Sequence, residues 1–529
     1  MYIAKRTKII LIAIAALAAF LRLAGLGSDE LIFDEGLYAF RSIGYLDYLD
    51  SASQTTPVQW LQDSSLPGWL KLSFHDHPPL VFLVQHIFFK LFGDSLFVAR
   101  LPSALGGIVS VFLFYLIGNL IGSRFLPQLK TKSVGLTTAL IASISFVLVS
   151  NSRLAMMEGI LFPLILLNIY YFLRLLEDTR HWWKFGLTLG LCFLTKYVSF
   201  FLLPTYALYL LINKPRLLKD KRLYLSLIIA LMVFSPVIVY NIYSYKTFGH
   251  FDLQLAYLLG QKLPWDTAFG GKTQEPFSNI AENLLTIFII PFLILAALGL
   301  TLILIRRDIR KELIWLPLAI VFITLMLTKI GSAIRFSSLY AIPGILLAAV
   351  GLTAMRDRFS KKWVLIPIAA FFVYELIFTA NLIFFNPPDY GVAKLDRYFD
   401  EIFNGQRSAG LPSHLNPHLN RVIQSYGASR PAMLTPMGIV YDDNLSLPAT
   451  LWSFSRRQYY HGLPIMPASS FYEKIKSGET EMFKGLTLYF VKTESGSPLK
   501  PIGLVSSGAA VEQFLQKNGR SPDTIIKAA

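Results

Sequence analysis

Long apolar runs recur from residue 8 to residue 384, and short polar or basic segments separate them. A helix that crosses a bilayer needs about 20 mostly apolar residues. The pattern therefore predicts eleven membrane-spanning helices, near residues 8–26, 98–122, 134–151, 158–175, 184–196, 197–213, 223–243, 284–305, 312–330, 336–354 and 363–384. The fifth run is short and abuts the sixth.

A further apolar run, Pro78 to Gly93, is only marginally long enough to cross a bilayer. Cytoplasmic loops are rich in Lys and Arg, and Lys5, Arg6 and Lys8 precede the first run, which predicts a cytoplasmic N-terminus. All later basic clusters also fall inside if residues 78–93 form an interfacial helix, so we predict one there. A cleaved signal peptide is the alternative interpretation of the first run, but the run continues through Leu26, which favours a membrane anchor.

Beyond residue 385 the composition becomes polar, and an odd number of spans places this tail outside the cytoplasm. Short apolar stretches such as Leu486–Val491 alternate there with helical patterns such as Ala509–Lys517, which is typical of a small α/β domain. The predicted fold is an α-helical polytopic membrane protein with an external α/β domain. Its parts are the membrane domain 1–385, with external loops at 27–97 and 244–283, and the soluble domain 386–529.

Composition agrees with a multi-pass protein of the cell membrane. Hydrophobic residues make up 54% and charged residues 16% of the 529 residues, whereas an ordinary soluble protein carries about 25% charged residues. The formal net charge of +16 is explained by basic cytoplasmic loops, so it does not indicate a nucleic-acid partner. Cys192 is the only cysteine, which excludes an intramolecular disulfide and a cysteine zinc site.

Charged residues within spans are costly and usually functional. Few lie in mid-span here, and the notable ones gather at predicted outer ends or in external loops: Asp34, Glu35, His75, Asp76, His77, Arg153, Glu158, Lys196, His250, Asp252 and Arg335. This distribution favours an active site at the outer membrane face. Transporters more often carry ionisable groups and broken helices near the midplane, so secondary transport or lipid flipping is the alternative function.

The acidic residues are candidates for proton transfer. Asp34 and Glu35 follow the first span, and adjacent side chains face different sides of a helix, so we expect one of them to enter a cleft as a general base. The alternative is a helix cap in a solvated loop. Glu158 stands near the start of an apolar helix, where an acid also stabilises the helix dipole.

The basic residues are candidates for phosphate binding. Arg153, Lys196 and Arg335 lie at predicted outer boundaries, where snorkelling to the interface is the alternative explanation. His77 precedes Pro78-Pro79 and could bind a phosphate or act as an acid. The alternative is that this segment only caps a helix and leaves its histidines at the surface. His75, Asp76 and His77 form a poor tetrahedral metal site because three ligands would come from three successive residues, so a metal is not favoured.

The ordered combination of these segments resembles the polyprenyl-phosphate-sugar-dependent glycosyltransferases of the GT-C class. The nearer match is the PMT-like branch (glycosyltransferase family 39), which contains dolichyl-phosphate-mannose protein mannosyltransferases and the lipid A aminoarabinose transferase. The resemblance covers about residues 1–245 and weakens to about 354. It rests on Asp34-Glu35, His77-Pro78-Pro79-Leu80, Arg100-Leu101-Pro102-Ser103-Ala104, Arg153 to Glu158, and Gly190 to Tyr197.

The resemblance implies a role for each matched residue. Asp34 would be the general base, supported by Glu35, and Glu158 matches a second acidic position that is often Asp in the family. The carrier phosphate would be bound by His77, Arg153, Lys196 and Arg335. His75, Asp76, His250 and Asp252 lie in external loops that would face the acceptor, without an assigned role.

The implied activity is inverting transfer of a sugar from a polyprenyl-phosphate donor, dolichyl or undecaprenyl, to a hydroxyl of a protein, lipid or glycan at the outer face. The lipid bilayer is a further partner, and no cofactor is required. An oligosaccharyltransferase or ligase with a pyrophosphate carrier is an alternative enzyme. A noncatalytic scaffold that presents the tail is another, but it leaves the clusters around Asp34 and Lys196 unexplained.

Overall fold

The computed structural model describes residues 5–44, 77–125, 134–261, 277–358, 365–492 and 507–517, except 33, 332, 415–416, 444, 446, 480 and 484. The chain divides into two compact units. The first contains Met1–Leu26 and Tyr45–Asn386, and the second contains Gly27–Gly44 and Pro387–Ala529.

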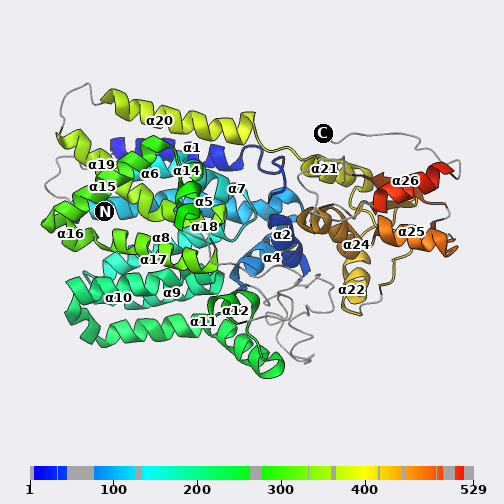
Figure 1. Cartoon of the computed structure of the whole chain (residues 1–529), viewed down its shortest axis with the longest axis horizontal. Helices are drawn as coiled ribbons and strands as arrows, with labels where there is room; N and C mark the ends of the chain where they lie inside the picture. The colour runs from blue at the N-terminus through cyan, green and yellow to red at the C-terminus, as the bar shows by residue number, and fades with distance from the viewer. Residues whose placement is uncertain are drawn as a thin grey trace. The chain divides into compact units, whose positions relative to one another are not determined.

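Helices dominate the described part of the first unit, and most of the long ones run in roughly the same direction (Figure 1). They are α1 (Lys5–Leu23), α4 (Leu80–Phe92), α5 (Leu96–Leu120), α6 (Val134–Ile144), α7 (Phe146–Arg153), α8 (Glu158–Leu175), α9 (Trp182–Thr195), α10 (Leu202–Asn213), α11 (Lys221–Phe248), α12 (Leu253–Leu258), α14 (Phe277–Ile287), α15 (Ile290–Ile305), α16 (Arg307–Leu313), α17 (Trp315–Ile330), α18 (Ile334–Ser337), α19 (Ala341–Arg358) and α20 (Leu365–Ala380). Each predicted span overlaps one of these helices or a bent pair of them.

Among the described residues, five helices are long and apolar enough to cross a membrane, and up to eight if each bent pair counts as one span. The multi-pass membrane fold is therefore confirmed, while the count of eleven stays a prediction. The prediction of one continuous helix over 284–305 is wrong, because a sharp bend divides this segment. α14 and α15 meet at 117°, because the chain leaves helical geometry at Ile289, just before Pro291 in the first turn of α15.

Small residues bring α9 and α11 close together. A Cβ added to Gly186 would lie 2.2 Å from the carbonyl oxygen of Ser226, and one added to Gly190 would lie 2.8 Å from that of Ala230. Membrane helices use glycine in this way to let backbones approach and gain van der Waals contact. This packing fixes the end of α9 relative to α11, and both helices contribute to the candidate site described below.

α6 and α7 meet at 55° on either side of Ser145. Side chains of α20, among them a buried carboxyl, form hydrogen bonds with the backbone groups that this break leaves without helical partners. The Phe146 amide donates to Glu375 Oε1 at 3.2 Å, and Thr379 Oγ1 donates to the Ile144 carbonyl at 2.7 Å. Backbone groups freed inside a bilayer need such partners because water is absent. Glu375 was not among the candidates from sequence, and these contacts explain its place within a span.

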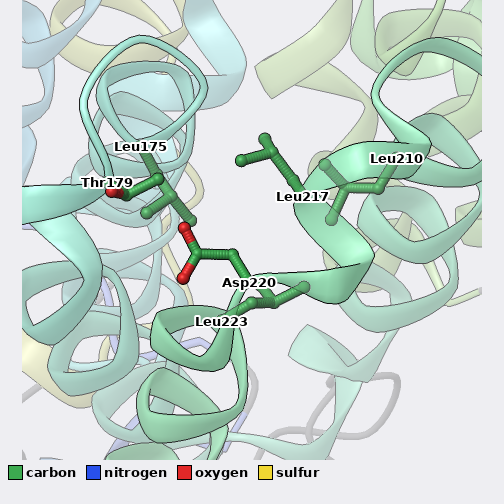
Figure 2. A pocket seen from close by; sticks show the side chains of 6 residues that line it. All are labelled: Leu175, Thr179, Leu210, Leu217, Asp220 and Leu223. Atoms are coloured by element: carbon green, nitrogen blue, oxygen red, sulfur yellow. The ribbon is translucent and has the colours of Figure 1, made fainter.

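A small apolar pocket lies where α8, α10 and α11 come together (Figure 2). Its lining consists of Leu175, Thr179, Leu210, Leu217, Asp220 and Leu223. The one carboxylate, Asp220, caps α11 by accepting from the Arg222 amide at 2.9 Å. The pocket therefore reflects packing between the ends of helices and carries no group of acids and bases.

The second unit is a small α/β structure, as predicted. Its parallel sheet has the order β2-β1-β3, with Ile439 of β1 opposite both Ile465 of β2 and Tyr489 of β3. The predicted strand and helix correspond to β3 and α26. The elements are α2 (Glu35–Gly44), α21 (Val392–Phe403), α22 (Pro417–Val422), β1 (Met437–Tyr441), α23 (Leu447–Thr450), α24 (Arg456–His461), β2 (Ile465–Pro467), α25 (Ala468–Lys476), β3 (Thr487–Val491) and α26 (Ser507–Lys517).

The start of the first external loop belongs to this second unit, whereas the sequence assigned it to the membrane domain. The Glu30 carboxylate accepts from the amides of Tyr390 and Ala393 at 2.8 and 2.9 Å. The Tyr460 hydroxyl donates to the Phe40 carbonyl at 3.3 Å. These contacts join α2 and the segment before it to residues more than 350 positions away, which local sequence patterns do not reveal.

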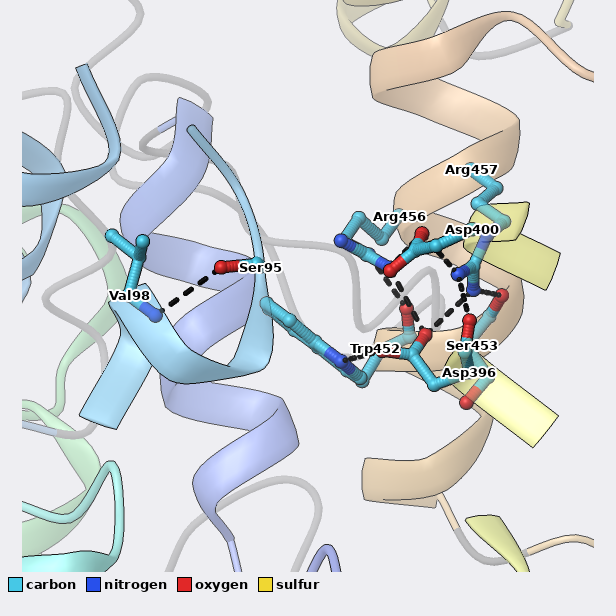
Figure 3. Close-up of polar contacts among 8 residues, drawn as sticks. All are labelled: Ser95, Val98, Asp396, Asp400, Trp452, Ser453, Arg456 and Arg457. Carbon is cyan, nitrogen blue, oxygen red and sulfur yellow. Dashed lines mark hydrogen bonds and ion pairs between the residues drawn. The ribbon is translucent and has the colours of Figure 1, made fainter. Parts of the chain in front are cut away.

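A buried ion cluster joins α21 to α24 (Figure 3). Asp396 Oδ1 accepts from Arg457 Nη1 at 2.7 Å and from Arg456 Nη2 at 3.0 Å, while its Oδ2 accepts from the Trp452 indole at 3.0 Å. Burial opposes ionisation of Asp396, but the two guanidinium groups outweigh it and hold its pKa below the ordinary value. Asp400 completes the cluster from the surface, with 44% of its side chain exposed.

Replacing Asp396 with asparagine is expected to destabilise the second unit by about 3 kcal/mol, because two buried guanidinium groups lose a charged partner. Hydrogen exchange of amides in α24 of the full-length protein measures this loss. Asp400→Asn is the matched control and should cost less, since the Asp400 side chain is itself half exposed.

The stabilisation that Asp396 gives to the second unit is expected to weaken at acidic pH. Because the folded pKa of Asp396 is lowered, its contribution is complete above the unfolded pKa of about 3.9 and is lost as pH falls through the folded value. Equal protection in wild type and Asp396→Asn at neutral pH would contradict the prediction.

Candidate active site

The centre of the site is a buried ion pair between the ends of two helices. α9 stops at Thr195, and Lys196 has an extended backbone, with φ −164° and ψ 135°, before a short 3₁₀ turn over Tyr197–Phe201. Lys196 Nζ lies 2.6 Å from Oε1 of Glu158, the first residue of α8, and the two side chains are 5% and 2% exposed. The break after α9 thus places an ammonium group against a carboxylate at the helix ends.

Arg335 of α18 is linked to this pair through an aromatic ring. The aromatic ring of Phe336 lies beside both cations. Its centroid is 4.8 Å from Lys196 Nζ and 4.9 Å from the guanidinium carbon of Arg335. Glu158, Lys196 and Arg335, which we call the charge cluster, carry one net positive charge and come from three segments far apart in sequence.

A polar network adjoins the charge cluster through the next residue. The Tyr197 hydroxyl donates to Asp252 Oδ2 at 2.5 Å, and the Asn241 amide donates to the same oxygen at 2.7 Å. The other carboxylate oxygen of Asp252 caps α12 by accepting from the Gln254 and Leu255 amides. The observed role of Asp252 is therefore to hold α11, α12 and the turn after Lys196 together.

His250 lies in the short connection between α11 and α12, which also contains Asp252. Its Nδ1 is 2.9 Å from the Phe251 carbonyl oxygen, and its own carbonyl accepts from the Ser244 hydroxyl at 2.8 Å. These contacts stabilise the turn. The acceptor-side role of His250 and Asp252 stays a prediction.

Arg153 and His77 occupy other positions in the first unit. Arg153 Nη1 donates to the Leu21 carbonyl of α1 at 2.9 Å, and its guanidinium lies 5.4 Å from the centroid of the Phe384 ring. These contacts tie the end of α7 to two neighbouring segments. His77 is buried directly before α4. Their phosphate-binding roles stay predictions, and His75 and Asp76 fall outside the described residues.

Asp34 and Glu35 lie at the start of α2 in the second unit. Glu35 is fully buried, and its Oε1 accepts from the Ile32 amide at 2.9 Å. Asp34 is half-buried, and the Tyr38 hydroxyl lies 3.5 Å from its Oδ2. The two adjacent carboxylates thus have different surroundings, and Asp34 is the one with solvent access.

Among the described residues, no group of three His, Cys, Asp or Glu side chains is arranged to hold a metal ion. The pocket of Figure 2 is also remote from the charge cluster, since Leu175 ends α8 and Glu158 begins it. At a rise of 1.5 Å per residue, the length of α8 separates them by about 26 Å.

Sequence reasoning missed Phe336, Asn241 and the role of Tyr197. Phe336 and Tyr197 each follow a predicted basic residue directly, which is the one signal that pointed to them. Asn241 lies within an apolar helix, and an isolated amide in such a helix is a useful sign of a polar partner.

Comparison with known proteins gives a family match and a fold match. Residues 76–240, which include Glu158 and Lys196, match the family model described as dolichyl-phosphate-mannose-protein mannosyltransferase. No curated protein matches the chain in sequence.

The fold is similar to that of ArnT from Cupriavidus metallidurans bound to undecaprenyl phosphate. The TM-score is 0.52 at 14% identity, covering 92% of this chain and 90% of that one. The apo state of the same protein gives a TM-score of 0.51 at 14% identity, with 91% and 92% coverage. Residues 76–240 thus carry the sequence pattern of the mannosyltransferase family model, and the chain as a whole has a fold similar to that of ArnT.

Proposed function

We infer that this protein is a glycosyltransferase that uses a polyprenyl-phosphate-linked sugar and transfers the sugar to an acceptor hydroxyl. The observation that carries the proposal is the buried ion pair of Glu158 and Lys196 at the ends of α8 and α9, because both residues lie within the segment that matches the mannosyltransferase family model. The ArnT neighbour is described as bound to undecaprenyl phosphate, which supports a lipid phosphate as the ligand of this fold.

The charge cluster suits the change in charge during transfer. A polyprenyl-phosphate sugar is a phosphodiester with one negative charge. When the bond from the anomeric carbon to the phosphate oxygen breaks, the leaving polyprenyl phosphate carries a second. Lys196 and Arg335 would stabilise this developing charge, which is the usual contribution of basic groups to phosphate departure.

The proposed proton acceptor is the Asp34 carboxylate. The acceptor hydroxyl gives its proton to Asp34, its oxygen forms a bond to the anomeric carbon, and the carrier phosphate leaves with the electron pair of the broken bond. A single displacement of this kind inverts the anomeric carbon. Glu158 would hold Lys196 in place, as its 2.6 Å contact indicates.

The acceptor is proposed only as a hydroxyl of a protein, lipid or glycan, and the sugar as a hexose or pentose.

The reaction is proposed at the outer face, with the N-terminus in the cytoplasm, because the basic clusters Lys214–Arg222, Arg306–Lys311 and Arg356–Lys362 would then all lie inside. The carrier tail would lie in lipid against the spans.

The purified full-length protein, supplied with polyprenyl-phosphate sugars and candidate acceptors, is expected to release polyprenyl phosphate and to invert the anomeric centre. Mass spectrometry of the lipid and NMR of the product measure both. Donors with a pyrophosphate carrier are the control and should not react. Movement of the intact donor across proteoliposome membranes without bond cleavage would contradict the proposal and favour a flippase.

A further inference from the structure

Phe336 holds an unusual position, because its ring lies beside two cations from separate parts of the chain. Lys196 Nζ is 4.8 Å from the ring centroid and the Arg335 guanidinium carbon is 4.9 Å from it. The ring itself is only 6% exposed. Both distances fall within the range of about 6 Å over which a ring face attracts a cation.

Two cations beside the same ring repel each other, and the protein must offset this repulsion before a phosphate arrives. Glu158 compensates one charge through its contact with Lys196. The quadrupole of the Phe336 ring places negative potential near both cations, and it does so without competing for their hydrogen-bond donors. Leucine at this position would fill space but would supply no such potential.

We propose that Phe336 is a positioning residue that keeps Lys196 and Arg335 converged for the phosphate of the lipid donor. This inference rests on the proposed function and adds to it a neutral residue that sets the affinity for the phosphate group. A preorganised pair of cations needs little rearrangement as charge develops on the phosphate. Phe336 should therefore affect both donor binding and the rate of transfer.

Fluorinated phenylalanines at position 336 provide the test, because each added fluorine weakens the attraction for cations while the ring keeps nearly the same shape. Undecaprenyl phosphate is the binding probe, and kcat/KM is measured with the sugar-linked donor. We expect affinity to fall stepwise with fluorine number, by between about 2-fold and about 30-fold in total. Phe336→Leu should match or exceed the largest loss.

The same analogues at Phe162 are the control, since this residue of α8 is buried in the apolar core of the first unit. Equal values for all analogues at Phe336, or an equal trend at Phe162, would overturn the proposal. A parallel loss of affinity for undecaprenol, the uncharged lipid, would also overturn it, because the ring would then contact the lipid tail.

Lys196→Met separates this inference from the function on which it rests. If Lys196→Met abolishes donor binding while the fluorinated series has no effect, the proposed function stands and the role of Phe336 fails. If Lys196→Met also leaves binding and transfer unchanged, the donor site itself is misplaced and both proposals fall.

Discussion

Replacing Lys196 with methionine is expected to lower the rate of sugar transfer by about 100-fold to 1,000-fold. Methionine keeps much of the length of the side chain but removes the ammonium group that lies 2.6 Å from Glu158. The leaving phosphate then gains its second charge with one fewer cation beside it. The measurement is kcat/KM for release of polyprenyl phosphate by the purified protein.

Lys184→Met is the matched control, because Lys184 lies on α9, the helix that Lys196 directly follows, and also contacts aromatic rings, those of Tyr171 and Trp183. It should retain activity. The double variant Glu158→Gln with Lys196→Met shows whether instability explains the loss, since it removes the buried carboxylate that the single change leaves without its cation. Thermal stability restored without activity supports the role of Lys196, whereas activity restored as well would refute it.

Replacing Asp34 with asparagine is expected to reduce transfer by at least about 100-fold, the lower end of the usual contribution of a general base. Asparagine caps a helix as well as aspartate does, so this variant keeps any structural role at the start of α2 and removes only the basicity. The readout is kcat for transfer against thermal stability. Loss of activity with unchanged stability supports the assignment.

Glu35→Gln is the control for Asp34→Asn. Its amide oxygen can still accept from the Ile32 amide, the contact that Glu35 Oε1 makes at 2.9 Å. We expect activity to fall much less than in Asp34→Asn. Full turnover in Asp34→Asn, or a larger loss in Glu35→Gln, would move the base assignment away from Asp34.

Some site residues were predictable from sequence because their chemistry is conspicuous where they stand. Lys196 separates two apolar runs and Glu158 begins another, so each was expected to have a polar partner. Their pairing was not predictable, since the two residues are 38 positions apart and local periodicity carries no information about such contacts. The contacts of Arg153 with the Leu21 carbonyl and the Phe384 ring were likewise not predictable from sequence, and its phosphate-binding role stays a prediction.

The membrane-embedded helical character, the approximate helix limits and the α/β nature of the tail could be predicted from the amino-acid sequence, because long apolar runs and short alternating strands follow directly from burial in lipid or in a core. The positions where helices bend, as at Ser145 and Ile289, became visible in the folded protein alone. The tertiary structure also joined Gly27–Gly44 to the tail and gathered Glu158, Lys196, Arg335 and Phe336. These features depend on contacts between residues distant in sequence, whose free energy exists only once the helices have packed.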